Sequence, residues 1–447
     1  MANQALSVSV GNALRRVRSY LFLVRGMGQL LRRRLDPTVR AQPAVIVLSL
    51  GSKGSSARVA AAARARGYRV VVFCAELPFA EARYMDHYHR IDCVTDFDKA
   101  LETARGYAPE AILLEGKNRL LPMQNNLAQT LGVTAVGNAA VKSSNSKIDL
   151  HASLDRAGLA NLPWEILPED GRSKLSFPVV SKPDVGTSSM GVQYLDSLDT
   201  FRNDKAYWDK VAQDTDIDGQ IMLESYIDGR QFDVEGVARD GAFHILTVVE
   251  EYYQNAAPYF PPSWFLFNPP IPEEQRARLE KRVEEALKAF GVTVGGWHCE
   301  SRFSDEKYGD GSLRPGIAGN EIYVLDYANR MGYNQLVSES CGADFAGAYV
   351  DTMLPRPFSP PQITRRSVLQ IMIRDTETLR RAKALAQARP DVVHRGAFVP
   401  FEFSAHTYFG HIVLSCPDFE TLRDALAAHD LIPDTWAGFY PDAMAGA

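Results

Sequence analysis

A lysine followed by a loop of small residues is the first place where this chain could carry out chemistry. Lys182 ends an apolar run, and "PDVGTSSMG" separates it from a second run that begins at residue 191. The lysine and serine side chains, together with backbone N–H groups freed by Gly186 and Gly191, could surround phosphate oxygens. Surface hairpins have similar compositions. The stretch alone is therefore also consistent with a turn between strands 179–183 and 191–195.

Two carboxylates in neighbouring apolar runs form a second candidate site. Alternation along "WHCESRF" puts His298 and Glu300 on one face of a strand, and Asp326 lies in "EIYVLDY". If the two strands pair as a hairpin, Glu300 and Asp326 could hold Mg²⁺, which takes one or two carboxylates plus substrate phosphates. Arg330 follows four residues later and could neutralise charge on a transferring phosphoryl group. A salt bridge between Arg330 and one acid is the alternative.

A third candidate lies in "MLESYIDGRQF", residues 222–232. An apolar strand runs into Glu224, and the connector after it could present backbone groups to a purine edge. Glu224 or Gln231 could then meet exocyclic or ribose groups. The alternative is an ordinary strand end with a solvated acid.

The chain lacks the patterns of the common hydrolases. It contains no Ser-His-Asp order, no H-E-x-x-H and no nucleophile elbow, and its nine histidines form no ligand pattern. Lysines and carboxylates are therefore expected to carry the chemistry.

Length and composition bound the class of protein. The chain has 447 residues, a net charge of −5 and 46% hydrophobic residues, which suggests a globular protein of roughly three domains. Its overall charge does not indicate binding to nucleic acid. No apolar run reaches 18 residues, so no transmembrane span is expected. The five cysteines are scattered without a Cys-x-x-Cys pair, and we expect reduced thiols in a cytoplasmic protein.

The N-terminal segment differs in charge from the rest. Residues 1–40 carry eight arginines and one acid, Asp36, a balance of +7 that leaves −12 for the remainder. Apolar residues at three-and-four spacing predict an amphipathic helix interrupted near Gly26 and Gly28. It could pack on its own body, form a subunit contact, or bind an anionic lipid or acidic partner.

The elements that must position these residues begin with a β-α-β unit. "AVIVLSLG", "SSARVAAAARARG" and "YRVVVFCAE" predict strand, helix and strand, and the pattern repeats in "EAILLEG" (110–116) and "GVTAVGN" (132–138). Uninterrupted apolar strands predict a parallel sheet covered on both faces. The loop "GSKGSS" (51–56) has neither Walker nor G-x-G-x-x-G spacing, so a tight turn is favoured over a phosphate site.

Shorter elements follow from residue 145. A helix begins at an Asn or Ser start signal and stops at Gly158, a hairpin turns at "RDGA", and residues 273–290 predict a charged amphipathic helix. Beyond a Pro-rich linker, the last unit from about residue 365 contains a strand, a turn and a helix in "GHIVLSCPDFETLRDALAAHD".

In this order, the motifs resemble the ATP-grasp superfamily over roughly residues 44–350. "SKPDVGTSSMG" is similar to the phosphate-covering loop of D-alanine–D-alanine ligases, and "HCE" followed by acid-x-x-x-Arg looks like the metal and phosphate cluster of amino-acid ligases. The C-terminal unit resembles the extra lobe of the L-amino-acid (dipeptide) ligase branch.

The resemblance implies an α/β and α+β architecture with these segments: 1–41, a basic helical segment; 42–140, a Rossmann-like domain; 141–225, the central subdomain with the phosphate lid; 226–355, the C-terminal subdomain with the metal and catalytic site; and 365–447, a small α+β lobe.

The resemblance also implies a role for individual residues. Lys147 and Lys182 match the two ATP-phosphate lysines, and Ser188 and Ser189 match the loop that closes on the β- and γ-phosphates. The connector residues Glu224, Ser225, Tyr226 and Ile227 match the adenine site. Glu300 and Asp326 match the Mg²⁺ ligands, with Mn²⁺ as an alternative ion, and Arg330 matches the arginine that stabilises an acyl phosphate.

Two positions depart from the family pattern. Gln231 stands where a ribose-binding Glu is usual, and Asp326-Tyr327-Ala328 replaces Glu-x-Asn, so that Asn329 is the nearest amide. For the substrates, the aromatic run at residues 250–270 could wall a pocket, with Glu250 or Glu251 meeting an amino group, or could simply close the core. His298, Tyr333 and Asn334 are the other pocket candidates.

The implied reaction joins a carboxylate to an amine. The carboxylate attacks the γ-phosphate of ATP to give an acyl phosphate, and an amine then displaces phosphate, so positioning and electrostatics suffice. We expect a cytoplasmic enzyme for small-molecule carboxylate and amine substrates in dipeptide or specialised metabolite synthesis, with a homodimer formed through residues 1–40. Another ATP-grasp chemistry, such as a carboxylase or purine-type ligase, and a non-catalytic ATP-binding protein are the alternatives.

Overall fold

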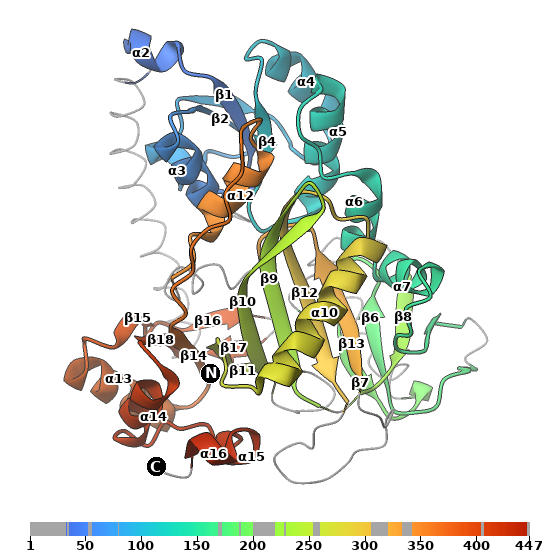
Figure 1. Cartoon of the computed structure of the whole chain (residues 1–447), viewed down its shortest axis with the longest axis vertical. Coiled ribbons are helices and arrows are strands. Elements are labelled where there is room, and N and C mark those ends of the chain that lie inside the picture. Colours follow the sequence, from blue (N-terminus) through green and yellow to red (C-terminus); the bar gives the residue numbers. More distant parts are fainter. Residues whose placement is uncertain are drawn as a thin grey trace, which may run out of the picture.

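A computed structural model gives the arrangement of the chain (Figure 1). It describes residues 33, 35–51, 56–78, 80–168, 172–186, 189–199, 220–227, 229–253, 260–304, 321–332, 342–403 and 406–444. Among these residues no helix combines the length and the apolarity needed to cross a membrane. Within the predicted basic segment only Arg33, Leu35 and the residues from Asp36 onward are described, including the short helix α2 (Pro37–Arg40).

The N-terminal part is a parallel sheet of four strands, as predicted. The order is β3-β2-β1-β4, formed by β1 (Ala44–Leu48), β2 (Arg69–Cys74), β3 (His87–Arg90) and β4 (Ala111–Leu113). Its helices are α3 (Ala57–Ala65), α4 (Phe97–Arg105) and α5 (Leu121–Leu131). Every residue of β1 is buried, because helices cover both faces of a parallel sheet.

The strand predicted in "GVTAVGN" is wrong. Residues 132–137 form no strand, since Gly132 ends α5 with φ 72° and Gly137 precedes α6 (Asn138–Asn145) with φ 93°. Glycines in these left-handed conformations reverse the chain where a strand would need extended backbone. The fourth strand of the sheet is instead β3, which the apolar patterns did not reveal because its residues are His, Tyr, His and Arg.

Two antiparallel sheets follow. The smaller has the order β5-β8-β6-β7, with β5 (Trp164–Ile166), β6 (Val179–Pro183), β7 (Gln193–Leu195) and β8 (Ile221–Ser225). The larger has the order β13-β12-β9-β10-β11-β14-β18-β15. Its first five strands are β9 (Gln231–Arg239), β10 (Ala242–Tyr253), β11 (Pro262–Phe267), β12 (Gly295–Phe303) and β13 (Ile322–Ala328).

The hairpin predicted at "RDGA" is confirmed. Strands β9 and β10 are joined at Asp240 and Gly241, which have φ values of 54° and 78°. Two consecutive residues with positive φ are the signature of a tight hairpin turn whose twist matches that of its strands.

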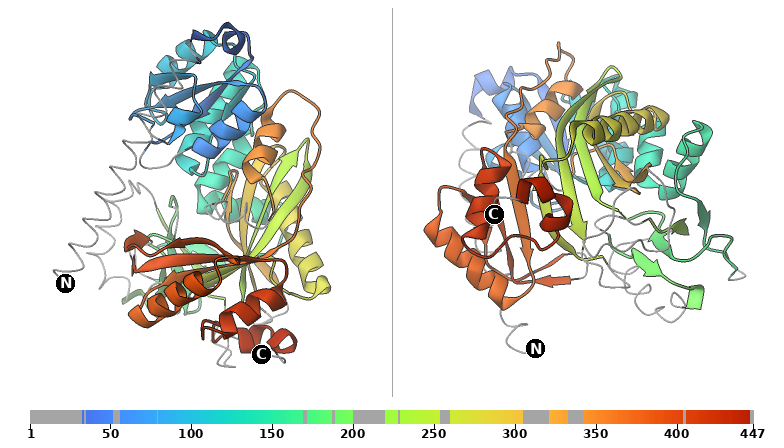
Figure 2. Two further views of the ribbon diagram at one scale, coloured as in Figure 1. Left: turned by 90° about the vertical axis from the view of Figure 1, so that its left-hand side faces the viewer. Right: turned by 60° about the horizontal axis from the view of Figure 1, so that its bottom comes forward.

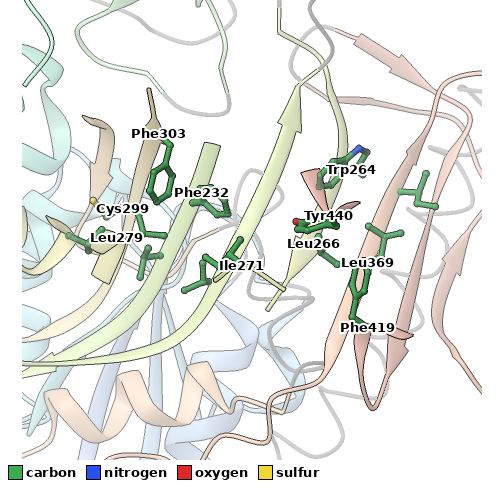
Figure 3. Packing of buried hydrophobic residues seen from close by; sticks show 14 of the residues in the cluster. Phe232, Trp264, Leu266, Ile271, Leu279, Cys299, Phe303, Leu369, Phe419 and Tyr440 are labelled. Carbon is green, nitrogen blue, oxygen red and sulfur yellow. The ribbon is translucent and has the colours of Figure 1, made fainter. Parts of the chain in front are cut away.

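The two faces of the larger sheet differ in composition. One face packs against helix α10 (Glu273–Ala289), which crosses β9 and β12 in Figure 1. Phe232, Val234, Cys299 and Phe303 belong to this core, and Figure 3 shows Phe232 and Phe303 packed together. The residues that alternate with them along β9 and β12 are polar and point to the other face.

The C-terminal strands continue the larger sheet. The strands β14 (Ser367–Ile373) and β18 (Gly410–Cys416) pair with each other, β14 pairs with β11, and β15 (Val393–Ala397) forms the edge. The remaining C-terminal elements are α13 (Thr376–Ala388), the hairpin β16 (Phe401–Phe403) and β17 (His406–Tyr408), α14 (Phe419–Ala427), α15 (Trp436–Phe439) and α16 (Pro441–Met444). The predicted strand, turn and helix at the end of the chain correspond to β18 and α14 and are confirmed.

One helix joins the larger antiparallel sheet to the parallel sheet. Helix α12 (Phe345–Met353) packs against α3 in a shared apolar core (Figure 2). Arg66, the residue that caps the end of α3, holds Asp351 through a pair of hydrogen bonds of 2.7 and 2.6 Å, and the buried Tyr349 hydroxyl accepts from Gln124 at 2.9 Å. These contacts fix the parallel sheet against the larger antiparallel sheet.

Candidate active site

One pocket receives side chains from both antiparallel sheets. It collects two lysines, five acids, one histidine and two arginines, together with apolar side chains that could enclose a flat ring. Its described lining comprises Lys147, Val180, Lys182, Pro183, Gly186, Ser189, Met190, Val192, Glu224, Ser225, Ile227, Gln231, Asp233, Glu251, Tyr253, Phe260, Phe265, His298, Glu300, Arg302, Leu325, Asp326 and Arg330.

Helix α7 (Lys147–Arg156) delivers the first lysine. Its N-cap is Ser146, whose hydroxyl accepts from the Asp149 N–H and donates to Asp184 at 2.7 Å. Asp184 also accepts from the Ile148 N–H at 2.9 Å, so the start of the helix is tied to the loop after β6. Lys147 Nζ consequently lies 3.3 Å from Asp326 Oδ2.

The second lysine stands at the end of β6, opposite a buried acid of β8. Lys182 Nζ lies 2.5 Å from Glu224 Oε1, and His151 Nε2 lies 3.2 Å from Glu224 Oε2. Burial by itself raises the pKa of Glu224, but Lys182 and His151 reverse this effect and lower it. Glu224 is therefore an anion that holds the lysine ammonium at the mouth of the loop.

The connector after β8 exposes one backbone donor. The N–H groups of Ser225 and Tyr226 donate to Pro163 and Pro178, and the Ile227 carbonyl accepts from Arg302 at 3.0 Å. Within the described ranges the Ile227 N–H has no acceptor. The Tyr226 ring does not line the pocket; it is buried against Tyr194 in an edge-on contact.

The loop between β6 and β7 is described only in part. Ser188 lies outside the described residues. Ser189 lines the pocket with φ 54°, and Gly191 completes the turn with φ 77°. Both conformations fit a loop whose backbone N–H groups change direction over a few residues.

The two carboxylates predicted to meet do so. Strand pairing sets Glu300 of β12 directly opposite Asp326 of β13, and Asp233 of β9 faces Glu300 from the other side. The side chains of Glu300 and Asp326 are 28% and 29% exposed, the most accessible of the three, while Asp233 is buried. Directly opposed residues have Cβ atoms roughly 5 Å apart, close enough to share one ion.

His298 connects the acids. Its Nδ1 lies 3.1 Å from Glu235 Oε1 and its Nε2 lies 3.2 Å from Glu300 Oε1. Burial lowers the pKa of His298, but the hydrogen bonds to Glu235 and Glu300 outweigh burial and raise it to about 10. Asp233, His298 and Glu300 have metal-ligand spacing. Through contacts of its two ring nitrogens with Glu235 and Glu300, His298 also fixes the position of the Glu300 carboxylate.

A second acidic pair lies deeper in the pocket. Burial, together with Glu251 and Glu300, raises the pKa of Asp233 well above its usual range, and burial also raises the pKa of Glu251. Tyr253 donates to Glu251 at 2.5 Å, and the aromatic rings of Phe260 and Phe265 line the same part of the pocket. The arrangement is an acidic recess with aromatic walls.

Arg330 enters the pocket beside the acids. Its Nε donates to Asn118 Oδ1 at 2.6 Å and its Nη1 to the Met331 carbonyl at 3.0 Å. Asn329 does not line the described pocket: its amide donates to the Gly296 carbonyl at 2.9 Å. An odd spacing from Asp326 puts Asn329 on the opposite side of the backbone, so it does not replace the missing Asn of the Glu-x-Asn pattern.

Strand alternation also divides the predicted aromatic run. Glu251, Tyr253 and Phe265 line the pocket, whereas Tyr252 and Trp264 stack on each other in the core. Both interpretations of this run therefore hold, for alternate residues. Residues 254–259 lie outside the described residues.

Of the predicted substrate residues, Glu250 does not line the described pocket. Glu250 alternates with Glu251 and forms a buried pair with Arg230 through contacts of 2.6 and 3.0 Å. Tyr333 and Asn334 lie outside the described residues.

Sequence reasoning missed Asp233 and Arg302. Arg302 donates to Gln231 Oε1 at 2.6 Å and fixes that amide in the pocket. The missed signal was period-two alternation of polar residues in "RQFDVEG" and "HCESRF", which marks one face of each strand.

The loop "GSKGSS" offers no open helix terminus. The Ser56 N–H donates to Glu81 Oε1 at 2.6 Å, and the N–H groups of Arg58 and Val59 donate to Glu115 Oε2 at 3.0 and 3.3 Å. Two of the protein's own carboxylates thus occupy the donors that a phosphate would need. Residues 52–55 lie outside the described residues.

Comparison with known proteins identifies one domain of the chain. Residues 175–309 match the family model of the ATP-grasp domain. This chain contains an ATP-grasp domain. The match covers the loop between β6 and β7, the connector after β8 and strand β12, which carries Glu300, and the structures compared below share their fold with most of the chain. No curated protein matches in sequence.

Several solved ATP-grasp structures share the fold. The L-amino acid ligase from Bacillus licheniformis has a TM-score of 0.67 at 19% identity, covering 87% of this chain and 97% of that one. N5-carboxyaminoimidazole ribonucleotide synthetase from Thermotoga maritima has a TM-score of 0.62 at 16% identity, with coverages of 87% and 98%. The biotin carboxylase domain dimer of the Hydrogenobacter thermophilus 2-oxoglutarate carboxylase, solved with MgADP, has a TM-score of 0.61 at 14% identity, with coverages of 87% and 89%.

Proposed function

We propose that this ATP-grasp protein is an ATP-dependent ligase that joins a carboxylate, such as that of an amino acid, to an amine through an acyl phosphate. The observation that carries the proposal is the convergence of Lys147, Lys182, Glu300, Asp326 and Arg330 on one pocket. These residues come from separate elements of the fold. Together they supply the positive charges and the carboxylates that bind and activate a triphosphate, and phosphoryl transfer of this kind needs no protein nucleophile.

ATP fits the side of the pocket next to the smaller sheet. Val180, Val192 and Leu325 provide apolar surfaces for the purine, and the open Ile227 N–H is a donor for its edge. Gln231, held by Arg302, is placed for the ribose. Lys147 and Lys182 then face the phosphates, where each would exchange its carboxylate partner for a phosphate oxygen. The loop with Ser188 and Ser189 would cover the β- and γ-phosphates.

The acids suit a magnesium ion. Mg²⁺ prefers hard oxygen ligands and usually takes one or two carboxylates, and Glu300 and Asp326 stand opposite each other at the accessible edge of the acidic row. When bound, the ion would neutralise charge on the transferring phosphoryl group; Mn²⁺ would serve in the same way. Asp326 is shorter than Glu and Ala328 offers no ligand, so substrate phosphates would complete the shell.

Two displacements then form the amide. A carboxylate oxygen of the first substrate attacks the γ-phosphorus, the bond to ADP breaks, and an acyl phosphate results. The substrate ammonium would first give one proton to a carboxylate of the pocket; the neutral amine nitrogen then attacks the acyl carbon, the bond to phosphate breaks, and the nitrogen loses a second proton to the departing phosphate. Arg330, beside the acids, stabilises negative charge on the acyl phosphate, while loop closure keeps out the water that would hydrolyse it.

The acidic recess favours an amine substrate with a positive charge. Glu251 and Asp233 are buried carboxylates within reach of the acyl site, and Tyr253, Phe260 and Phe265 surround them. Aromatic faces attract an ammonium group, and its charge would stabilise the ionised form of these buried acids, whose pKa values are raised in its absence. Glu251 is therefore the amino-group ligand that we propose, and Glu250 is not, because Arg230 occupies it.

Release of phosphate from ATP in the presence of paired carboxylates and amines tests the proposal. We expect a pair of amino acids to raise phosphate release well above the ATP-only rate, with an amide product of matching mass. If ATP binds and no pair has this effect, the ligase proposal fails. Release that depends on bicarbonate would instead indicate a carboxylase.

The remaining predictions are part of the proposal. The domain boundaries, a cytoplasmic location, a role in specialised metabolite synthesis and a homodimer formed through residues 1–40 are supported by the sequence patterns. Size-exclusion chromatography with light scattering of the full chain and of a chain beginning at residue 42 would measure the contribution of the basic segment to assembly.

A further inference from the structure

A buried ion pair lies directly behind the acidic recess. Arg230, the residue before Gln231, donates to both carboxylate oxygens of Glu250 at 2.6 and 3.0 Å. The side chains of Arg230 and Glu250 are only 4% and 1% exposed. Two charges that have lost their water are stable together only where their geometry is good and the surrounding groups compensate them. What surrounds Arg230 therefore decides whether this part of the fold holds its shape.

Three aromatic rings surround the Arg230 guanidinium group. Its Cζ atom lies 5.1 Å from the ring centre of Phe232, 5.0 Å from that of Phe439 and 4.8 Å from that of Tyr440. Aromatic faces at such distances attract a cation, and they do so most strongly where water is excluded. Phe439 and Tyr440 belong, with Trp436, to a group of rings near the end of the chain that we name the C-terminal aromatic cluster.

This cluster also packs behind the strands whose other face forms the acidic recess. The ring centre of Tyr252 in β10 lies 6.3 Å from that of Phe439, and the ring centre of Trp264 in β11 lies 6.2 Å from that of Trp436. Tyr252 and Trp264 stack on each other, and Trp264 belongs to the core that Figure 3 draws. The end of the chain thus covers the rear of both strands.

Strand alternation transmits these contacts to the pocket. Where β9 pairs with β10, Gln231 lies opposite Glu251, and both side chains line the pocket. Glu250 and Tyr252, on either side of Glu251, point to the opposite face, where Arg230 and the cluster hold them. Because the three residues share one backbone, fixing the outer two fixes the direction of the third.

We propose that the C-terminal aromatic cluster positions Glu251 for the amine substrate, acting through Arg230 and Glu250. The inference rests on the proposed ligase function and deepens it, because it gives the end of the chain a part in the recognition of the amine. Residues of the cluster are positioning residues, since none of them lines the described pocket.

The nucleotide side of the pocket has supports of its own. Arg302 of β12 donates to Gln231 at 2.6 Å and to the Ile227 carbonyl at 3.0 Å. Lys147 and Lys182 come from α7 and β6, which lie outside the larger sheet. Loss of the cluster should therefore affect the amine more than ATP.

Two substitutions of Tyr440 make a matched pair for the test. The Tyr440 hydroxyl is buried and makes no hydrogen bond within the described part of the chain, so Tyr440→Phe keeps the ring over Arg230 and should match the wild type. Tyr440→Leu removes the ring. We expect it to raise the KM of the amine by roughly 3- to 30-fold, the span of one cation–π contact, with kcat and the KM of ATP changed by less than about twofold. Phe439→Leu, at a half-buried ring, should act in the same direction.

Hydrogen–deuterium exchange of the protein without ligands measures the positioning independently of turnover. In Tyr440→Leu and Phe439→Leu we expect faster exchange in peptides that cover residues 248–253, with no change in Tyr440→Phe or in the parallel sheet of any variant. Circular dichroism confirms that each variant folds.

Three results would overturn the inference. They are unchanged exchange at residues 248–253 in both variants that lose a ring, an equal rise in the KM values of the amine and of ATP, and the same behaviour of Tyr440→Phe and Tyr440→Leu. If no carboxylate and amine pair supports turnover in the wild type, the ligase proposal fails, and the exchange measurement still decides whether the cluster fixes the strand that carries Glu251.

Discussion

Two Gly- and Ser-rich loops in this protein look alike in sequence and differ in their surroundings. "GSKGSS" (51–56) follows strand β1, and "KPDVGTSSMG" (182–191) follows the core of strand β6. At the first loop, Glu81 and Glu115 accept the N–H groups at the start of α3. At the second, the carboxylates contact lysine side chains, and the pocket remains open.

The difference indicates that loop composition alone does not decide whether neighbouring donors are already taken by the protein's own carboxylates. Backbone N–H groups attract any anion, including the protein's own carboxylates. A phosphate site needs more positive than negative charge at the position of the phosphate. Any acids nearby must lie where they can hold a metal ion, and must not accept hydrogen bonds from the N–H groups that would bind the phosphate. The following predictions test this distinction, in order of decreasing effect.

The largest effect is expected at the metal end of the ATP-grasp pocket. Glu300→Gln and Asp326→Asn each remove one carboxylate that faces the proposed ion, and we expect amine-dependent turnover to fall by on the order of 10³. Turnover at several Mg²⁺ concentrations measures the effect. Glu321→Gln, an exposed acid just before β13, is the control. A near-normal rate in either pocket variant would show that these acids do not hold a catalytic ion and only accept hydrogen bonds from the protein, as Glu81 and Glu115 do at the first loop.

The lysines should have the next largest effect. Lys147→Met and Lys182→Met leave the apolar stems in place and remove the charges that face the triphosphate, so the Kd of ATP should rise by about 10²-fold. Titration with a fluorescent ATP analogue measures it, and Lys174→Met, an exposed lysine of the same region, should not change it. An unchanged Kd in both pocket variants would place the nucleotide elsewhere.

Asn118 should have a smaller effect of a different kind. Asn118→Leu removes the acceptor that orients Arg330, and we expect kcat to fall by about tenfold with the KM of ATP unchanged. Asn118→Asp retains an acceptor oxygen and should recover most of the rate. Loss of ATP affinity with Asn118→Leu, or no recovery with Asn118→Asp, would indicate that Asn118 only supports folding.

At the first loop we expect a change in stability without loss of ATP binding. Burial raises the pKa of Glu115 to about 7 from 4.5, so the folded state keeps a proton that the unfolded state releases. The free energy of unfolding should therefore fall as pH rises from about 4.5 to 7, by roughly 1 to 3 kcal/mol. Glu115→Gln should flatten this dependence in urea denaturation series. An unchanged pH dependence would contradict the assignment.

Local patterns predicted most of the elements around the site. The strand at 179–183, the turn at Asp240-Gly241 and the helix at 273–290 follow from periodicity and turn residues, and β6 has the predicted bounds. The predictions failed where local composition is ambiguous, as in the apolar "GVTAVGN" that forms no strand and the polar β3 that does.

The site was predictable to the extent that residues lie on neighbouring strands. Alternation and a hairpin were enough to bring Glu300 and Asp326 together, and the same reasoning applied to β9 would have added Asp233. It could not find Asn118, because a contact across 212 positions in sequence depends on how α12 and α6 hold the parallel sheet against the larger one.

The sequence by itself determined the strands and turns, the residue types at the ATP-grasp motifs and the faces on which they lie, because these depend on interactions over a few residues. Only the tertiary structure decided that Glu81 and Glu115 accept the backbone donors at the start of α3, and that Glu251 rather than Glu250 enters the pocket. Those outcomes depend on charges brought together from distant segments, and the Coulomb interactions that select them act through space rather than along the chain.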